Sequence, residues 1–260
     1  MIFAKKSLGQ NFLKDKNILN KIINLNNLKK KNVIEIGPGK GDLTDEILKK
    51  KPESLIIIEK DFSLSKELKI KYSKNKNLKV FNDDILSFDI NKIVKKNTVI
   101  LGNLPYNISS QILVKIIKLK KLRSCIDGII FMFQKELGEK IISKFPSPKY
   151  GRLSILTNLK LNIENKFLVS PNCFVPRPKV TSMVIYFKVN KDVVFKIKKI
   201  ENLELVTNIL FSNKRKMINK NIKKILDSKK ITKIKELKLN VRPTELGPKI
   251  FYKITELFEK

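Results

Sequence analysis

The chain has 260 residues, no histidine and two cysteines, and it carries a formal net charge of +32 at pH 7. The missing histidine excludes Ser-His-Asp and Cys-His nucleophiles and HExxH zinc sites, and Cys125 and Cys173 lack CxxC spacing, so we expect no metal site. No stretch approaches the roughly 20 apolar residues that cross a bilayer, and the first residues do not resemble a secretory signal, which predicts a cytoplasmic protein.

The positive charge favours a polyanionic partner such as nucleic acid. It is nearly all lysine, however, and lysine, asparagine and isoleucine are all abundant. An AT-rich coding bias would produce the same composition in any protein. The charge is therefore consistent with a nucleic-acid substrate without establishing one.

Short apolar runs alternate with amphipathic stretches of helix length over the first half of the chain. Repeated strand–helix units at this spacing predict a parallel, doubly wound α/β sheet. The expected strands are 32–36, 54–58, 78–81, 98–101 and 127–133, and the expected helices are 42–50, 62–72 and 108–119.

Polar features follow the first four of these strands. The glycine loop 37–41 comes after the first strand, and Glu59, Asp84 and Asn103 come at the ends of the next three. Parallel sheets bind ligands at the carboxyl edge of their strands. We therefore expect all four features along one rim of the sheet.

The pattern changes after residue 150. Two strand-like runs, 159–169 and 181–189, flank a proline-rich loop from Pro171 to Pro178, and the chain then becomes lysine-rich with a helical period. We interpret residues 1–190 as a catalytic domain and 191–260 as a small helical RNA-binding domain. The helices expected in the tail are 203–211, 217–226, 231–237 and 246–258.

The first three of the rim features suggest a nucleoside-containing cofactor. Glycines such as Gly37 and Gly39 at a strand-to-helix turn let the backbone approach a ligand and direct free amides towards it. Glu59 can accept hydrogen bonds from both hydroxyls of a ribose, or it is only a solvated residue at the end of a strand. Asp84 can accept a hydrogen bond from an adenine amine, or it serves as a turn or N-cap residue. NAD and S-adenosylmethionine both fit this pattern.

The segment Asn103-Leu104-Pro105-Tyr106 matches the signature of enzymes that methylate exocyclic amines of bases. An adenine amine is a poor nucleophile because its lone pair is delocalised into the ring. The side-chain carbonyl of Asn103 and the backbone carbonyl of Leu104 can accept its hydrogens, while Pro105 stiffens the turn. Tyr106 offers a face on which an extruded base can stack.

With these residues the chain resembles the small-subunit rRNA adenine N6,N6-dimethyltransferase family nearly from end to end. Several motifs of that family occur in order. They are Leu8–Leu13 (LGQNFL, where many relatives have Phe in place of Leu8), Asn103–Ser109 (NLPYNIS), Gln134–Glu136, Tyr150–Ser154, Phe174–Ser182 (FVPRPKVTS), Lys214–Lys216 and Arg242–Pro243.

The resemblance implies an S-adenosylmethionine-dependent methyltransferase with a Rossmann-like sheet and a helical C-terminal domain. Phe174 would be a second aromatic wall opposite Tyr106, unless it is a loop phenylalanine that covers the core. The implied substrate is small-subunit ribosomal RNA within a partly assembled 30S particle. The resemblance also implies a monomeric enzyme that dimethylates two adjacent adenosines near the 3′ end of this RNA. The implied cofactor contacts are Asn11, Leu13, Gly37, Gly39, Glu59, Asp84 and Asn103.

Other functions remain compatible with the sequence. A methylase of large-subunit rRNA, of the kind that confers macrolide resistance, shares the catalytic motifs, and a DNA adenine methylase is close in chemistry. A non-catalytic ribosome-assembly factor would use the same fold and basic tail. A nicotinamide-dependent oxidoreductase is disfavoured by Asn103–Tyr106 and by the lack of an evident acid at a hydride site.

Overall fold

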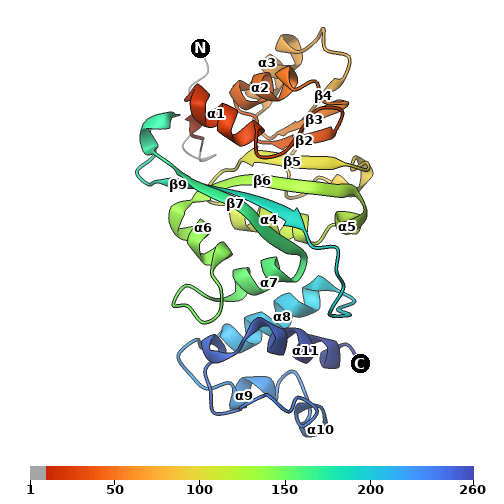
Figure 1. Ribbon diagram of the computed structural model, residues 1–260, viewed down its shortest axis with the longest axis vertical. Helices are drawn as coiled ribbons and strands as arrows, with labels where there is room; N and C mark the ends of the chain where they lie inside the picture. Colours follow the sequence, from red (N-terminus) through yellow and green to blue (C-terminus); the bar gives the residue numbers. More distant parts are fainter. Residues whose placement is uncertain (1–9) are drawn as a thin grey trace. The chain divides into compact units, whose positions relative to one another are not determined.

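The computed structural model describes residues 10–260, so Leu8 and Gly9 of the LGQNFL motif lie outside the described residues. The chain forms two compact units (Figure 1). One comprises the described part of Met1–Gly138 together with Asn162–Val189, and the other comprises Glu139–Leu161 together with Asn190–Lys260. Residues 139–161 were expected to belong with the sheet, whereas they cluster with the tail. The assignment of 1–190 to catalysis and 191–260 to RNA binding stays a prediction.

The first unit is built on a seven-stranded sheet with the order β4-β3-β2-β5-β6-β9-β7. Pairing is parallel from β4 to β6, and β9 then runs antiparallel to β6. This arrangement confirms the predicted parallel α/β sheet and extends it by two strands. The strands are β2 (Asn32–Ile36), β3 (Ser54–Glu59), β4 (Leu78–Asn82), β5 (Thr98–Asn103), β6 (Ile126–Gln134), β7 (Leu161–Val169) and β9 (Ser182–Val189).

The central strands are apolar because both faces of the sheet are covered by helices, as parallel sheets require. Side chains of α1 (Lys16–Ile23), α2 (Asp42–Lys49) and α3 (Phe62–Lys71) share one buried cluster with β2 and β3. Figure 1 shows these three helices grouped together. The helix α4 (Ser109–Ile117) follows β5, and the short α5 (Leu122–Cys125) precedes β6.

Helix starts follow local capping chemistry. The Asp15 side chain accepts hydrogen bonds from the amides of Asn17 and Ile18, and the Asp61 side chain accepts from those of Ser63 and Leu64. These bonds satisfy donors that the first turn of a helix otherwise leaves unpaired. They set the start of α1 and α3.

A separate two-stranded sheet joins the N-terminal segment to the proline-rich loop. In it β1 (Phe12–Leu13) pairs antiparallel with β8 (Phe174–Val175), with Leu13 opposite Phe174. The Lys14 amide adds a hydrogen bond of 2.8 Å to the Cys173 carbonyl. This pairing brings segments about 160 residues apart in sequence to the same place.

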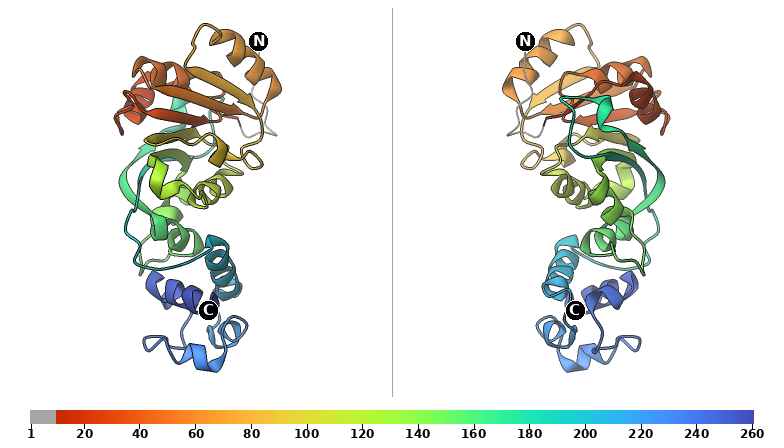
Figure 2. Two further views of the ribbon diagram at one scale, coloured as in Figure 1. Left: turned by 90° about the vertical axis from the view of Figure 1, so that its right-hand side faces the viewer. Right: turned by 90° about the vertical axis from the view of Figure 1, so that its left-hand side faces the viewer.

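The second unit is helical. The aromatic rings of Phe211 and Phe251 stack with centroids 5.5 Å apart, and the Tyr252 hydroxyl donates to the Ile155 carbonyl at 2.8 Å. Its helices are α7 (Arg152–Lys160), α8 (Ile200–Phe211), α9 (Asn219–Ile222), α10 (Ser228–Ile231) and α11 (Pro248–Phe258), and α6 (Lys135–Ile142) bridges the two units in sequence. Of the two middle helices of the tail, α9 is shorter than the predicted helix 217–226, and α10 overlaps the predicted helix 231–237 only at Ile231. From residue 10 onward, no helix is long and apolar enough to span a membrane. Figure 2 shows the same elements from two further sides.

Candidate active site

A pocket opens at the carboxyl edge of the parallel strands, entirely within the first unit. It is bordered by the ends of β2, β3 and β5, by the turns that follow β2, β3, β4 and β5, and by the segment before α1. Nearly all the predicted site residues meet there, as expected from the topology. Those that line it are Asn11, Leu13, Gly37, Gly39, Glu59, Asp84, Asn103, Leu104, Pro105 and Tyr106.

Asn103 is the last residue of β5, and its side chain has a defined orientation. Its Nδ2 donates to the backbone carbonyl of Asn11 at 2.8 Å. Since the nitrogen is engaged, the Oδ1 atom is presented on the other side of the amide group. Within residues 10–260, no group donates a hydrogen bond to Oδ1 or to the Leu104 carbonyl. Both acceptors required by the methylation hypothesis are therefore available.

Tyr106 is held at two points. The Ser109 hydroxyl donates to the Tyr106 carbonyl at 3.1 Å, and the Tyr106 hydroxyl lies 2.5 Å from the hydroxyl of Ser182. Both serines are fully buried. Burial raises the pKa of the Tyr106 phenol, partly offset by the hydrogen bond to Ser182. The phenol is therefore neutral at physiological pH and offers an uncharged ring to the pocket.

The glycine loop adopts backbone conformations that favour glycine. Gly37, Gly39 and Gly41 have φ values of 67°, 59° and 83°. A Cβ atom at Gly39 would lie 2.8 Å from the ring of Phe12, and one at Gly41 would overlap the Tyr72 hydroxyl. The loop thus packs closely against two aromatic side chains, and larger residues would push them away.

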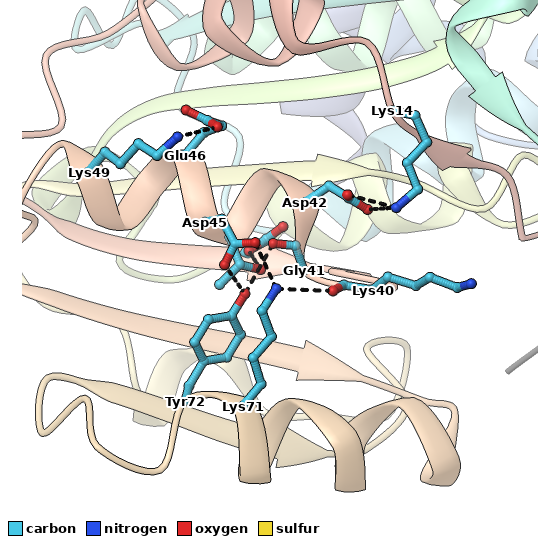
Figure 3. Close-up of polar contacts among 11 residues, drawn as sticks. Lys14, Lys40, Gly41, Asp42, Asp45, Glu46, Lys49, Lys71 and Tyr72 are labelled. Carbon is cyan, nitrogen blue, oxygen red and sulfur yellow. Dashed lines mark hydrogen bonds and ion pairs between the residues drawn. The ribbon is translucent and has the colours of Figure 1, made fainter. Parts of the chain in front are cut away.

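The start of α2, which follows the glycine loop, is braced by charged side chains (Figure 3). The Tyr72 hydroxyl lies 2.7 Å from Asp45 Oδ1 and 3.1 Å from the Gly41 carbonyl, and Lys71 Nζ lies 2.7 Å from Asp45 Oδ2. Lys14 forms an ion pair with Asp42 at 2.6 Å. These contacts tie both α3 and the N-terminal segment to the loop.

Glu59 and Asp84 lie in different environments. Glu59 is 6% exposed and accepts hydrogen bonds from the amides of Gly39 and Asp61, and burial raises its pKa. The Asp84 carboxylate accepts from Lys60 Nζ at 2.8 Å and from the Leu86 amide at 2.9 Å, which lower its pKa. Asp84 therefore acts as a turn residue, and it also borders the pocket.

The structure adds a buried carboxyl group that the sequence analysis did not assign. Glu35 lines the pocket, is 1% exposed, and accepts a hydrogen bond of 2.6 Å from the Thr44 hydroxyl. Burial raises its pKa to about 8. The hydrogen bond from Thr44 lowers the pKa, and the negative charges of Asp45 and Glu59 raise it further. An acidic residue inside an otherwise apolar strand, two positions before Gly37, was the signal in the sequence.

Phe174 lies in the core and not at the edge of the pocket. It is 2% exposed, belongs to the same buried cluster as Leu13 and Val169, and does not border the pocket. Pairing of β8 with β1 turns its side chain into the core. In this structure Phe174 covers the core, and its role as a second aromatic wall opposite Tyr106 around a target base stays a prediction.

The chain is similar to known proteins over nearly its whole length. A family model described as ribosomal RNA adenine dimethylase matches residues 2–260. A protein of Pelagibacter ubique named ribosomal RNA small subunit methyltransferase A is 43% identical over 257 residues, which cover 98% of this chain and 97% of that protein. A protein of the same name from Mycoplasmopsis synoviae is 40% identical, with 92% and 89% covered.

Two solved structures share the fold. A dimethyladenosine transferase from Plasmodium falciparum superposes with a TM-score of 0.76 at 24% identity and covers 94% of this chain and 95% of its own. The 23S rRNA methyltransferase ErmE gives a TM-score of 0.70 at 21% identity, with 96% and 100% covered. At this level of identity the two similarities support the fold alone.

Proposed function

Because the chain belongs to the ribosomal RNA adenine dimethylase family, we propose that it transfers methyl groups from S-adenosylmethionine to the N6 amines of two adjacent adenosines near the 3′ end of small-subunit ribosomal RNA. The product is N6,N6-dimethyladenosine. The observation that carries the proposal is the side chain of Asn103, whose Nδ2 is bound to the Asn11 carbonyl so that its Oδ1 is left as an acceptor beside the pocket.

The hydrogen-bonding groups around the pocket fit an adenosine-containing cofactor. Glycines with positive φ lie beside Glu59, a carboxylate that can accept ribose hydroxyls, and Asp84 lies at the next strand end, where it can accept from an adenine amine. Leu13 and Asn11 close the pocket from the N-terminal segment. When bound, S-adenosylmethionine supplies a methyl group made electrophilic by the adjacent sulfonium charge.

The catalytic role of the turn after β5 is orientation. Asn103 Oδ1 and the Leu104 carbonyl accept the two hydrogens of the adenine amine, which directs the nitrogen lone pair into the pocket. Pro105 limits the turn to one backbone shape. Tyr106 stacks on the target base after it leaves the RNA helix. The amine becomes acidic once it is alkylated, so no strong base is required and the contribution is mainly proximity and alignment.

The substrate is bound through its phosphates and shape by a basic surface, with the helical tail as part of it. The enzyme acts as a monomer in the cytoplasm on RNA within a partly assembled small subunit. The chain aligns with a relative named ribosomal RNA small subunit methyltransferase A over 97% of that protein's length, and this supports the small-subunit substrate over a large-subunit or DNA substrate.

A methyl-transfer assay tests the proposal. Small subunits, large subunits and duplex DNA, all lacking the modification, are incubated with tritiated S-adenosylmethionine, and the products are digested to nucleosides. We expect dimethyladenosine from the small subunit alone. Label in the large subunit or in DNA would assign the enzyme to that substrate, and cofactor binding without transfer to any of the three would favour an assembly factor.

A further inference from the structure

The hydroxyl pair of Tyr106 and Ser182 joins two segments that are 76 residues apart in sequence. Their oxygens lie 2.5 Å apart. Tyr106 borders the pocket, whereas Ser182 is fully buried and does not. Ser182 can therefore influence a bound substrate only through its contact with Tyr106.

The sheet explains why the two side chains meet. Asn103 on β5 is paired with Met132 on β6, and Met132 is paired with Val184 on β9. Since β9 runs antiparallel to β6, its first residue, Ser182, lies at the edge where β5 ends. Tyr106 follows the end of β5 by three residues and reaches the same edge.

Ser182 is a rigid partner. Its backbone is registered with Gln134 at the end of β6, and the preceding residue Thr181 accepts a hydrogen bond of 2.9 Å from the amide of Lys135. A buried serine has one χ angle and little room to move, so its oxygen is fixed by the sheet. The hydrogen bond to this fixed oxygen therefore holds the hydroxyl end of the Tyr106 ring in place.

The hydrogen bond from Ser109 fixes only the backbone carbonyl of Tyr106. With this bond alone, the tyrosine ring could still rotate about its side-chain bonds. The bond to Ser182 removes this freedom, so the ring presents one face to the pocket before the base arrives. Preorganised groups lose less conformational entropy on binding and hold reacting atoms in line. We propose that Ser182 is a positioning residue, which sets the Tyr106 ring at the angle required for stacking on the target base. The inference rests on the proposed role of Tyr106 in methyl transfer.

A double-mutant cycle tests it. Ser182→Ala, Tyr106→Phe and the double variant are compared with the wild type in single-turnover methyl transfer to small subunits, and cofactor affinity is measured separately by calorimetry. We expect each single variant to lose about three- to tenfold in rate, as for one hydrogen bond. The double variant should lose no more than Tyr106→Phe alone, because each substitution removes the same bond. Cofactor affinity should not change.

Ser65→Ala is the matched control, because Ser65 is also buried in this unit and its hydroxyl has no hydrogen-bond partner within residues 10–260. We expect it to keep the wild-type rate. Losses that multiply in the double variant, or a cofactor affinity that falls with the rate, would show that Ser182 acts on the fold rather than through Tyr106.

Two further outcomes are decisive. If Ser182→Ala does not fold, as judged by its melting curve, Tyr106→Phe alone decides, and an unchanged rate for that variant would overturn the inference. A wild-type protein that transfers no methyl group to any RNA would instead overturn the proposed function, so the two failures are distinguishable.

Discussion

The side-chain nitrogen of Asn103 donates a hydrogen bond of 2.8 Å to the backbone carbonyl of Asn11. This bond links the end of β5 to the segment before β1, and both of these segments line the pocket. It gives the Asn103 amide a single orientation, and it holds the N-terminal segment over the glycine loop. Asn11 therefore contributes through its backbone, which a substitution of its side chain leaves in place.

Replacing Asn103 with alanine should abolish most methyl transfer. The variant loses an acceptor aligned with the reacting amine, and loss of one aligned polar group at reacting atoms costs about a hundredfold or more in rate. Cofactor binding should be only partly reduced, because the remaining pocket residues are unchanged. Single-turnover transfer and calorimetric cofactor binding measure the two effects. Asn77→Ala, at an exposed asparagine on the approach to β4, is the control. Unchanged turnover in Asn103→Ala would refute the role.

Replacing Gly39 with alanine should weaken cofactor binding by about tenfold or more. The new Cβ would lie 2.8 Å from the Phe12 ring, and the φ of 59° is strained for alanine, at a cost on the order of 1–2 kcal/mol. The N-terminal segment must then shift from the pocket. Gly151→Ala is the control, since a Cβ there would meet nothing closer than Phe211 at 4.0 Å. Equal affinity for Gly39→Ala and wild type would contradict the close packing.

Glu35 should make the stability of the cofactor-free protein fall as pH rises from about 4.5 to about 8. Its pKa is raised from 4.5 to about 8 in the folded state, mainly by burial, so the folded protein binds more protons than the unfolded chain in that range. Stability is lost wherever the folded state holds the extra proton and pH increases. Below 4.5 the carboxyl is protonated in both states and has no such effect.

The comparison that isolates this effect is Glu35→Gln, which keeps an acceptor for the Thr44 hydroxyl and does not ionise. Denaturant unfolding at several pH values should show the variant gaining on the wild type as pH rises through this window, and no further above it. A difference between the two proteins that is constant with pH would mean that Glu35 has an ordinary pKa.

RNA affinity should fall steeply with salt. Binding through phosphates releases counterions, so the logarithm of the association constant decreases linearly with the logarithm of the salt concentration. Fluorescence anisotropy with a fragment of small-subunit RNA at several salt concentrations measures the slope. A flat response would mean that the charge of +32 reflects coding bias rather than RNA binding.

The sequence alone determined the sheet and the rim on which the site is built. The predicted strand 32–36 is β2, and each of the next three expected strands differs from the observed one by no more than two residues at its end. Apolar runs of strand length are a local signal, and parallel strands necessarily bring their carboxyl ends to one edge. For this reason the sequence alone predicts that Gly37, Glu59, Asp84 and Asn103 lie together.

Only the tertiary structure decided what surrounds those residues. The burial of Phe174, the raised pKa of Glu35 and the contact of Ser182 with Tyr106 all depend on segments far apart in the chain. So does the association of residues 139–161 with the tail. Local periodicity contains no information on which distant segment packs over a side chain. The burial, the hydrogen bonds and the pKa of that side chain depend on this packing.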